Sequence, residues 1–110
     1  MIRFKRGDIV LVEVIFSEGT GGKKRPALII SKDEYNLSRE EVIIAAITSN
    51  IDRKFIGETL IKDWRESGLL CKSMVTGIIQ TIKRNLILKK IGKLTDNDFR
   101  AVDNNFGNII

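Results

Sequence analysis

Residues 25–50 read RPALIISKDEYNLSREEVIIAAITSN and contain two nearly continuous apolar runs on either side of a polar segment. The runs RPALIIS (25–31) and EVIIAAITSN (41–50) have the composition of strands that are buried on both faces. The segment between them, KDEYNLSRE (32–40), is polar and typical of turns. The stretch therefore predicts two central strands of a sheet, joined by a turn-rich connection.

Further strands are predicted on both sides of this pair. They are DIVLVEVIF at 8–16, a weaker strand KFIGETLI at 54–61, and KSMVTGIIQTI at 72–82. Gly77 in the last of these indicates a bulge or a close approach of another segment. KDWRESGLL (62–70) is expected to hold one short helical turn that ends near Gly68.

The C-terminal segment has the pattern of an amphipathic helix. Thr95 is a good N-cap, and Asp96 and Asp98 favour the first helical turn. The apolar residues at helical spacing are Phe99, Val102, Phe106 and Ile109. Several short strands followed by one helix predict a mainly β, α+β fold, built as a small antiparallel barrel or curled sheet.

Length and composition limit the class of protein. The chain has 110 residues, which predicts a single domain over residues 1–110. No apolar run approaches the roughly 20 residues of a membrane helix, and no signal peptide is evident, so no membrane association is expected. One cysteine excludes an internal disulfide and is compatible with the cytoplasm. The net charge of +5 favours an anionic partner such as nucleic acid.

The residue types present also restrict the possible chemistry. The chain has no histidine and one cysteine, which excludes histidine-dependent catalysis and leaves no strong zinc site, so no metal or cofactor is expected. GTGGKK (19–24) lacks the spacing of a phosphate-binding P-loop. RNA cleavage remains possible, because RNA supplies its own nucleophile, the 2′-hydroxyl, and the protein needs only to align it and stabilise charge.

Four stretches over nearly the whole chain resemble one protein family. They are RGDIVLVEV (6–14), GGKKRPALIIS (21–31), IIAAITSN (43–50) and TIKRNLILKKIGKL (81–94). In this order they are similar to the MazF/PemK toxin endoribonucleases of bacterial toxin–antitoxin pairs. The resemblance implies an SH3-like barrel of the kind shared with the gyrase-poisoning toxin CcdB, and a homodimer. It also implies metal-independent, sequence-specific cleavage of single-stranded RNA, inhibition of translation and growth, and neutralisation by a small antitoxin whose tail covers the RNA site.

Two catalytic positions follow from the resemblance. Arg25 matches the arginine before the family's proline, and Thr48 matches the threonine of its AITS-like motif. Without the resemblance, Arg25 is better explained as a cation at a strand entry, and Thr48 as an ordinary strand residue. A guanidinium stays protonated and is a poor general base, so we expect Arg25 to hold the phosphate and stabilise the transition state.

The remaining site residues are predicted to contact RNA. They are Phe16, Glu18, Thr20, Lys23, Lys24, Ser49 and Gln80. Lys23 and Lys24 are expected to attract the phosphate backbone without specifying sequence. Phe16 is as compatible with core packing as with stacking on a base.

One departure from the family pattern keeps an alternative open. Family members commonly carry an acid followed by Gln in the fifth strand, whereas Gly77 or Ile78 occupies the acid's position here and Gln80 follows. The alternative is a non-catalytic member of the fold, either a CcdB-like gyrase poison or an RNA-binding module. The basic cluster between Lys83 and Lys93 is equally compatible with a solvated face, an antitoxin-docking surface and an RNA groove.

Overall fold

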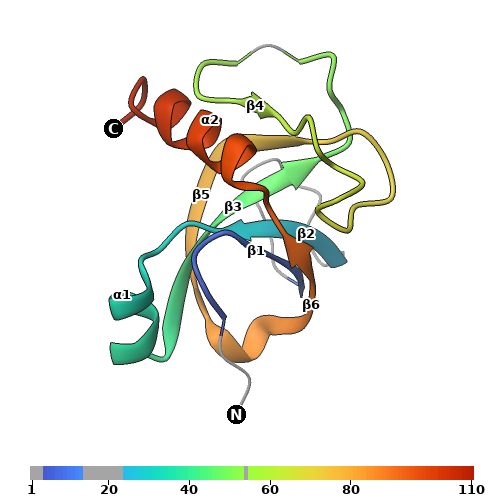
Figure 1. Cartoon of the computed structure of the whole chain (residues 1–110). Coiled ribbons are helices and arrows are strands. Elements are labelled where there is room, and N and C mark those ends of the chain that lie inside the picture. The colour runs from blue at the N-terminus through green and yellow to red at the C-terminus, as the bar shows by residue number, and fades with distance from the viewer. Residues whose placement is uncertain (1–3, 14–23, 54) are drawn as a thin grey trace.

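The computed structural model describes residues 4–13, 24–53 and 55–110. Its elements are β1 (Asp8–Glu13), β2 (Lys24–Ile29), α1 (Asp33–Ser38), β3 (Glu41–Thr48), β4 (Thr59–Leu60), β5 (Met74–Lys83), a 3-10 turn (Arg84–Leu86), β6 (Ile87–Lys93) and α2 (Asp96–Phe106). The six strands form one antiparallel sheet of order β4-β5-β3-β2-β1-β6 (Figure 1). This mainly β arrangement with a C-terminal helix confirms the predicted fold class.

The two strands predicted to be central lie in the middle of the sheet, with Ala27 of β2 opposite Ala46 of β3. Both faces of this pair are buried. One face contributes to a cluster that also contains Ile82 of β5 and packs against Ile87 of β6. Because β5 and β6 lie toward opposite edges of the strand order, their meeting at one cluster shows that the sheet curls around it. The other face packs beneath α2, whose Val102 is buried there.

The connection between the central strands was predicted as a turn-rich loop, and this prediction was wrong for residues 33–38, which form α1. Two features explain the helix. Asp33 and Glu34 lie in its first turn, where a carboxylate interacts favourably with the helix dipole. Asn36 is buried, and its side-chain amide donates a 3.1 Å hydrogen bond to the carbonyl of Ser31. A buried hydrogen bond to Ser31, which follows the end of β2, therefore holds a turn of helix that the polar composition does not demand.

The strand predicted over 54–61 is reduced to Thr59–Leu60, and Lys54 lies outside the described residues. Gly57 has a φ of +90°, and the carbonyl of Phe55 accepts a hydrogen bond from the amide of Glu58, so the chain turns where a strand was expected. The strand predicted over 8–16 is present as β1, and residues 14–16 also lie outside the described part. β6 was not predicted as a strand, because its sequence, ILKKIGK, shows no alternation of apolar and polar residues.

The C-terminal helix was predicted correctly. The amide of Asp98 donates to the hydroxyl of Thr95, which confirms the N-cap, and Phe99 and Phe106 pack on the core with Val102. Beyond the helix, Ile109 reaches back over the bulge in β5, where a Cβ at Gly77 would lie 3.3 Å from it. In the part of the chain that the structure describes, no helix is long and apolar enough to cross a membrane.

Candidate functional site

A cleft of about 850 Å³ opens at the ends of the central strands. Its walls come from β1, the start of β2, the end of β3, β6, and the irregular segment between residues 68 and 73. Its lining includes the apolar residues Leu11, Pro26 and Ile47, which we call the apolar floor, together with residues that carry hydroxyl, amide and cationic groups. A cleft with an apolar floor and a polar rim suits a ligand that has both flat apolar parts and charged parts.

Arg25 and Thr48 both line this cleft and are both half-buried. Ala27 of β2 lies opposite Ala46 of β3. Because the two strands are antiparallel, the residue two positions before Ala27 is level with the residue two positions after Ala46, so Arg25 is level with Thr48. The Thr48 hydroxyl oxygen accepts a 3.1 Å hydrogen bond from the backbone amide of Asn50. This contact uses a lone pair of the oxygen and leaves the hydroxyl proton to be donated to a ligand. The structure therefore brings the two predicted catalytic side chains to one site.

The cleft is positively charged. Its described lining contains three cations, Arg25, Lys89 and Lys90, and none of the described residues that line it is acidic. Lys90 is partly neutralised, because its ammonium nitrogen lies 3.2 Å from a carboxylate oxygen of the buried Asp8. Lys89 makes no side-chain hydrogen bond or ion pair among the described residues. The cations of the described lining therefore favour an anionic ligand, and Lys89 contributes more than Lys90, which Asp8 partly neutralises.

The cations of the basic cluster from Lys83 to Lys93 lie at different places on the folded protein. Only Lys89 and Lys90 reach the cleft. Lys83 borders a shallow hollow with two acids, Glu40 and Glu41, and Lys93 lies beside α2.

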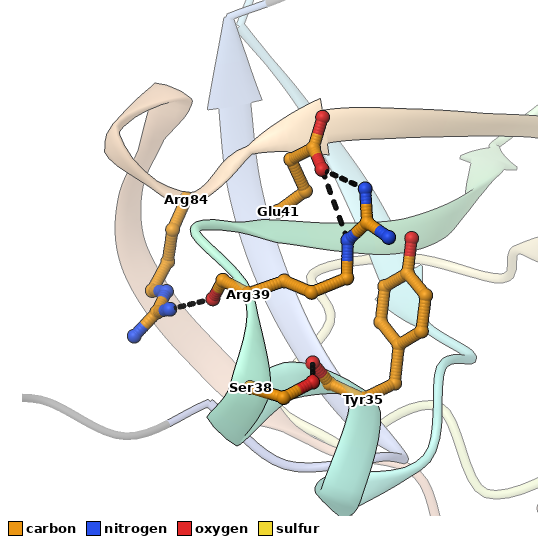
Figure 2. Close-up of polar contacts among 5 residues, drawn as sticks. All are labelled: Tyr35, Ser38, Arg39, Glu41 and Arg84. Atoms are coloured by element: carbon orange, nitrogen blue, oxygen red, sulfur yellow. Dashed lines mark hydrogen bonds and ion pairs between the residues drawn. The ribbon is translucent and has the colours of Figure 1, made fainter.

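Arg84, from the same cluster, has a structural role in the connection between β5 and β6. Its guanidinium donates to the carbonyl of Arg39 (Figure 2). Arg39 itself is paired with Glu41 and lies over the Tyr35 ring, 5.0 Å from its centroid. The hydrogen bond that Arg39 donates to the Glu41 carboxylate, helped by the charges of Tyr35 and Glu41, raises the pKa of Arg39 above its ordinary value. This exposed group joins α1 to the sheet at a distance from the cleft lining.

The other predicted RNA-binding residues are placed differently. Ser49 is exposed and lines the cleft beside Thr48. Lys24 is exposed at the start of β2, opposite Glu13, and does not line the cleft. Gln80 of β5 lies opposite Ile44. It is therefore distant along the strand from Met74, the residue of β5 that lies opposite Thr48. Phe16, Glu18, Thr20 and Lys23 lie outside the described residues.

Sequence reasoning missed the wall formed by residues 68–73, which contributes Leu70, Cys71 and Ser73 to the cleft. Cys71 is a free thiol and exposed. The available signal was the glycine at 68, whose φ is +89° and which ends the predicted helical turn. Nothing in the local pattern connects that turn with β6, which lies against it only in the folded chain.

Gly77 and Ile78, one of which falls where the resemblance implies the family's acid, border a hollow of about 450 Å³. This hollow is lined by exposed apolar residues, which we call the apolar patch: Phe55, Ile56, Ile79, Ile109 and Ile110. One ion pair, Arg53 with Glu58 at 2.8 Å, lies beside the patch. Among the described residues, no group of three or more His, Cys, Asp or Glu side chains could hold a metal ion.

Comparison with known proteins gives consistent matches over almost the whole chain. Residues 5–110 match the family described as PemK-like, MazF-like toxin of type II toxin-antitoxin system. The chain is 31% identical over 103 residues to a protein of Staphylococcus saprophyticus named endoribonuclease MazF, covering 91% of this chain and 85% of that protein.

Solved structures show the same fold. A MazF from Deinococcus radiodurans superimposes with a TM-score of 0.77 at 17% identity, covering 99% of this chain and 97% of that one. The Mycobacterium tuberculosis toxin MazF-mt6 gives a TM-score of 0.76 at 24% identity, covering 92% and 93%. The Deinococcus radiodurans protein has also been crystallised as a MazE-MazF complex, with a TM-score of 0.75 at 15% identity and coverage of 99% and 96%.

Proposed function

This chain belongs to the PemK-like, MazF-like toxins of type II toxin–antitoxin systems, and we propose that it is a metal-independent endoribonuclease that cleaves single-stranded RNA. The observation that carries the proposal is that Arg25 and Thr48 line one positively charged cleft whose described lining contains no acid. A guanidinium and a hydroxyl proton at one cleft supply the positive charge and the hydrogen bond that stabilise a phosphodiester in its transition state. Messenger RNA as the substrate would place the protein in the cytoplasm, where its cleavage stops translation and growth.

The proposed reaction is an attack of the RNA's own 2′-hydroxyl on the adjacent phosphorus. The bond between O2′ and phosphorus forms, the bond between phosphorus and O5′ breaks, and the O2′ proton is lost as O5′ gains one. The products are a 2′,3′-cyclic phosphate and a 5′-hydroxyl. Arg25 holds the nonbridging oxygens as their charge grows, and Thr48, whose oxygen accepts from the Asn50 amide, donates a hydrogen bond to one of them and keeps its proton.

Ser49 and the apolar floor of the cleft support a further part of the proposal, that the enzyme selects a sequence. Phosphate contacts position a strand, whereas base contacts specify it. Ser49 is exposed beside Thr48 and offers both a donor and an acceptor to a base edge. Lys24, at the entry of β2, is proposed to attract the backbone from outside the cleft, and Gln80 to contact RNA farther along β5.

We further propose that the protein acts as a homodimer and is neutralised by a small antitoxin. The apolar patch supports the dimer, because Ile56 is 75% exposed and Phe55 is 64% exposed, side by side with Ile79 and the C-terminal isoleucines. A related MazF crystallised with MazE supports the antitoxin. An antitoxin segment with acidic side chains is expected to compete with RNA for the positively charged cleft. The match over residues 5–110 supports one toxin domain over the whole chain.

The test is incubation of the purified protein with a long unstructured RNA in the presence of EDTA, followed by mapping of new 5′ ends. We expect discrete cuts that carry 5′-hydroxyls, and no cuts with Arg25→Ala, whose retained fold is checked by circular dichroism. Intact RNA across several substrates would contradict the proposal and leave the non-catalytic alternative, an RNA-binding module or a gyrase poison. Cutting that requires an added metal would contradict the proposed mechanism alone.

A further inference from the structure

We propose that Leu70 and Lys89 form a subsite for one nucleotide beside the cut, with Leu70 against its base and Lys89 on its phosphate. This proposal rests on the proposed function and gives a binding role to two residues that lie apart in the sequence. Both line the cleft that contains Arg25 and Thr48. A strand whose scissile phosphate lies at Arg25 must continue across one of the cleft's walls.

The loop that carries Leu70 is fixed at its base. Ser67 and Gly68 lie directly against β6, since a Cβ at Gly68 would be 2.7 Å from the Ile91 carbonyl oxygen. The next residue, Leu69, is buried in the core beneath α2, and its amide donates to the carbonyl of Trp64. On the other side, the carbonyl of Ser73 accepts a 2.9 Å hydrogen bond from the amide of Ile61. Leu70 is therefore an apolar side chain held on an anchored loop.

Leu70 is nevertheless 97% exposed, although the side chain directly before it is buried. Single exposed apolar residues are common on protein surfaces, but this one borders a cleft whose floor is already apolar. An unstacked base in single-stranded RNA presents a flat face that gains from contact with such a side chain. Because the loop is already anchored, little further ordering is needed when the base binds.

Lys89 supplies the charge at the same subsite. It lies opposite Leu11 of β1, whose side chain forms part of the cleft floor. Its neighbour Lys90 is held by the buried Asp8, whereas Lys89 has no acidic partner in the part of the chain that is described. The two adjacent lysines therefore differ in role, and only Lys89 keeps its full charge for a phosphate.

RNA fits this subsite better than a protein segment does. A protein partner would need only the charge and the apolar surface, in any order along the cleft. RNA has a fixed order of phosphate and base at every nucleotide, and the subsite offers a cation and an apolar side chain on neighbouring walls, next to the proposed catalytic pair. The antitoxin is the competing occupant, and the experiment distinguishes the two.

The experiment measures the affinity of Leu70→Ala and Lys89→Ala for an oligonucleotide that spans a mapped cut site. A 2′-deoxy nucleotide at the cut prevents reaction, and fluorescence anisotropy reports Kd as salt is varied. We expect Lys89→Ala to raise Kd about fivefold to tenfold and to reduce the salt slope by about 0.7, the value for one phosphate contact on a single strand. Lys93→Ala, an exposed lysine of the same strand outside the cleft lining, is expected to change neither quantity.

Leu70→Ala is tested by scanning an abasic nucleotide through the positions that flank the cut. We expect a Kd about fivefold higher than wild type on the intact oligonucleotide, and no difference from wild type when one particular flanking base is absent. Leu37→Ala, an exposed leucine on α1, serves as the control and is expected to bind as wild type does. Circular dichroism confirms that each variant is folded.

The outcomes separate this subsite from the proposed function. Wild-type protein that cuts RNA, together with unchanged Kd values for both cleft variants, would contradict the subsite alone. Unchanged RNA binding with weaker inhibition by the antitoxin would assign the same residues to the antitoxin and overturn the proposal. Wild-type protein that cuts no RNA would contradict the proposed function and the subsite with it. Loss of binding limited to one flanking base supports the subsite.

Discussion

The contact between residue 67 and β6 makes Gly92→Ala the most informative change to the cleft. A Cβ at Gly92 would lie 2.0 Å from the Ser67 carbonyl oxygen and 2.8 Å from its carbonyl carbon. Ordinary contact begins near 3.4 Å, so the backbone must separate by about 1.4 Å, the difference between 3.4 Å and 2.0 Å. Both partners are main-chain atoms, so no side-chain rotation relieves the clash. The added methyl must therefore push the loop that carries Leu70 away from β6.

The expected cost has two parts. Overpacking of this kind reduces the free energy of unfolding by about 2–3 kcal/mol, which lowers Tm by roughly 10 °C in a domain of this size. Movement of one cleft wall by more than about 1 Å is also expected to reduce kcat/KM by about 100-fold. The reduction in activity should persist at temperatures where the variant is fully folded.

Guanidinium unfolding followed by tryptophan fluorescence measures the first part. Trp64 is the chain's only tryptophan and lies in the displaced turn, so its emission reports directly on this region. Gly107→Ala is the control, because Gly107 has a φ of −59° and its added Cβ would meet only Asn104 at 3.2 Å. We expect it to change stability by less than about 1 kcal/mol. A Gly92→Ala protein as stable as wild type would refute the proposed contact between loop and strand.

Three further predictions test the site, the fold and the assembly. Thr48→Val is expected to lower the single-turnover rate of RNA cleavage about 100-fold, with Thr48→Ser retaining most activity, and equal rates for both variants would remove the hydroxyl from the mechanism. The buried Asp98 carboxylate accepts hydrogen bonds from the amides of Lys62 and Asp63 at 3.1 Å and 2.8 Å, and Asp98→Ala leaves both amides without an acceptor. Chemical denaturation should therefore show a free energy of unfolding lower by about 2–4 kcal/mol. A smaller decrease would mean that water replaces the carboxylate. Ile79→Lys is expected to convert a dimer into a monomer in light scattering, and a mass equal to that of wild type would assign the apolar patch another role.

The sequence was sufficient for the centre of the sheet because its two strands are consecutive and almost entirely apolar. Antiparallel neighbours with a short connection bring the start of one strand beside the end of the next. Arg25 and Thr48 lie at those two ends, so their proximity follows from the strand assignment once the register is known. The terminal helix was also predictable, because its cap and its apolar spacing are local properties.

The elements that sequence reasoning missed depend on contacts that no local pattern shows. Helix α1 is held by the buried Asn36, which donates to the Ser31 carbonyl, and the Ser31 hydroxyl in turn accepts from the amide of Ile43 in β3. Strand β6 is an edge strand whose lysines protect that edge from pairing with other chains, and its sequence, ILKKIGK, has no alternation of apolar and polar residues. Periodicity alone cannot distinguish such a strand from a polar loop.

Only some of the residues that line the cleft could be predicted from the sequence. The cleft's catalytic half comes from strand ends, and strand ends are visible in a sequence. Its other half depends on two glycines, Gly68 and Gly92, that let an irregular loop lie against the backbone of β6. Gly68 lies in none of the family-like stretches, and Gly92 lies in one that gives the glycine no role; each glycine matters only because the other segment is there. The residues that this contact positions, Leu70 and Lys89, are for the same reason the ones whose role only a folded structure can suggest.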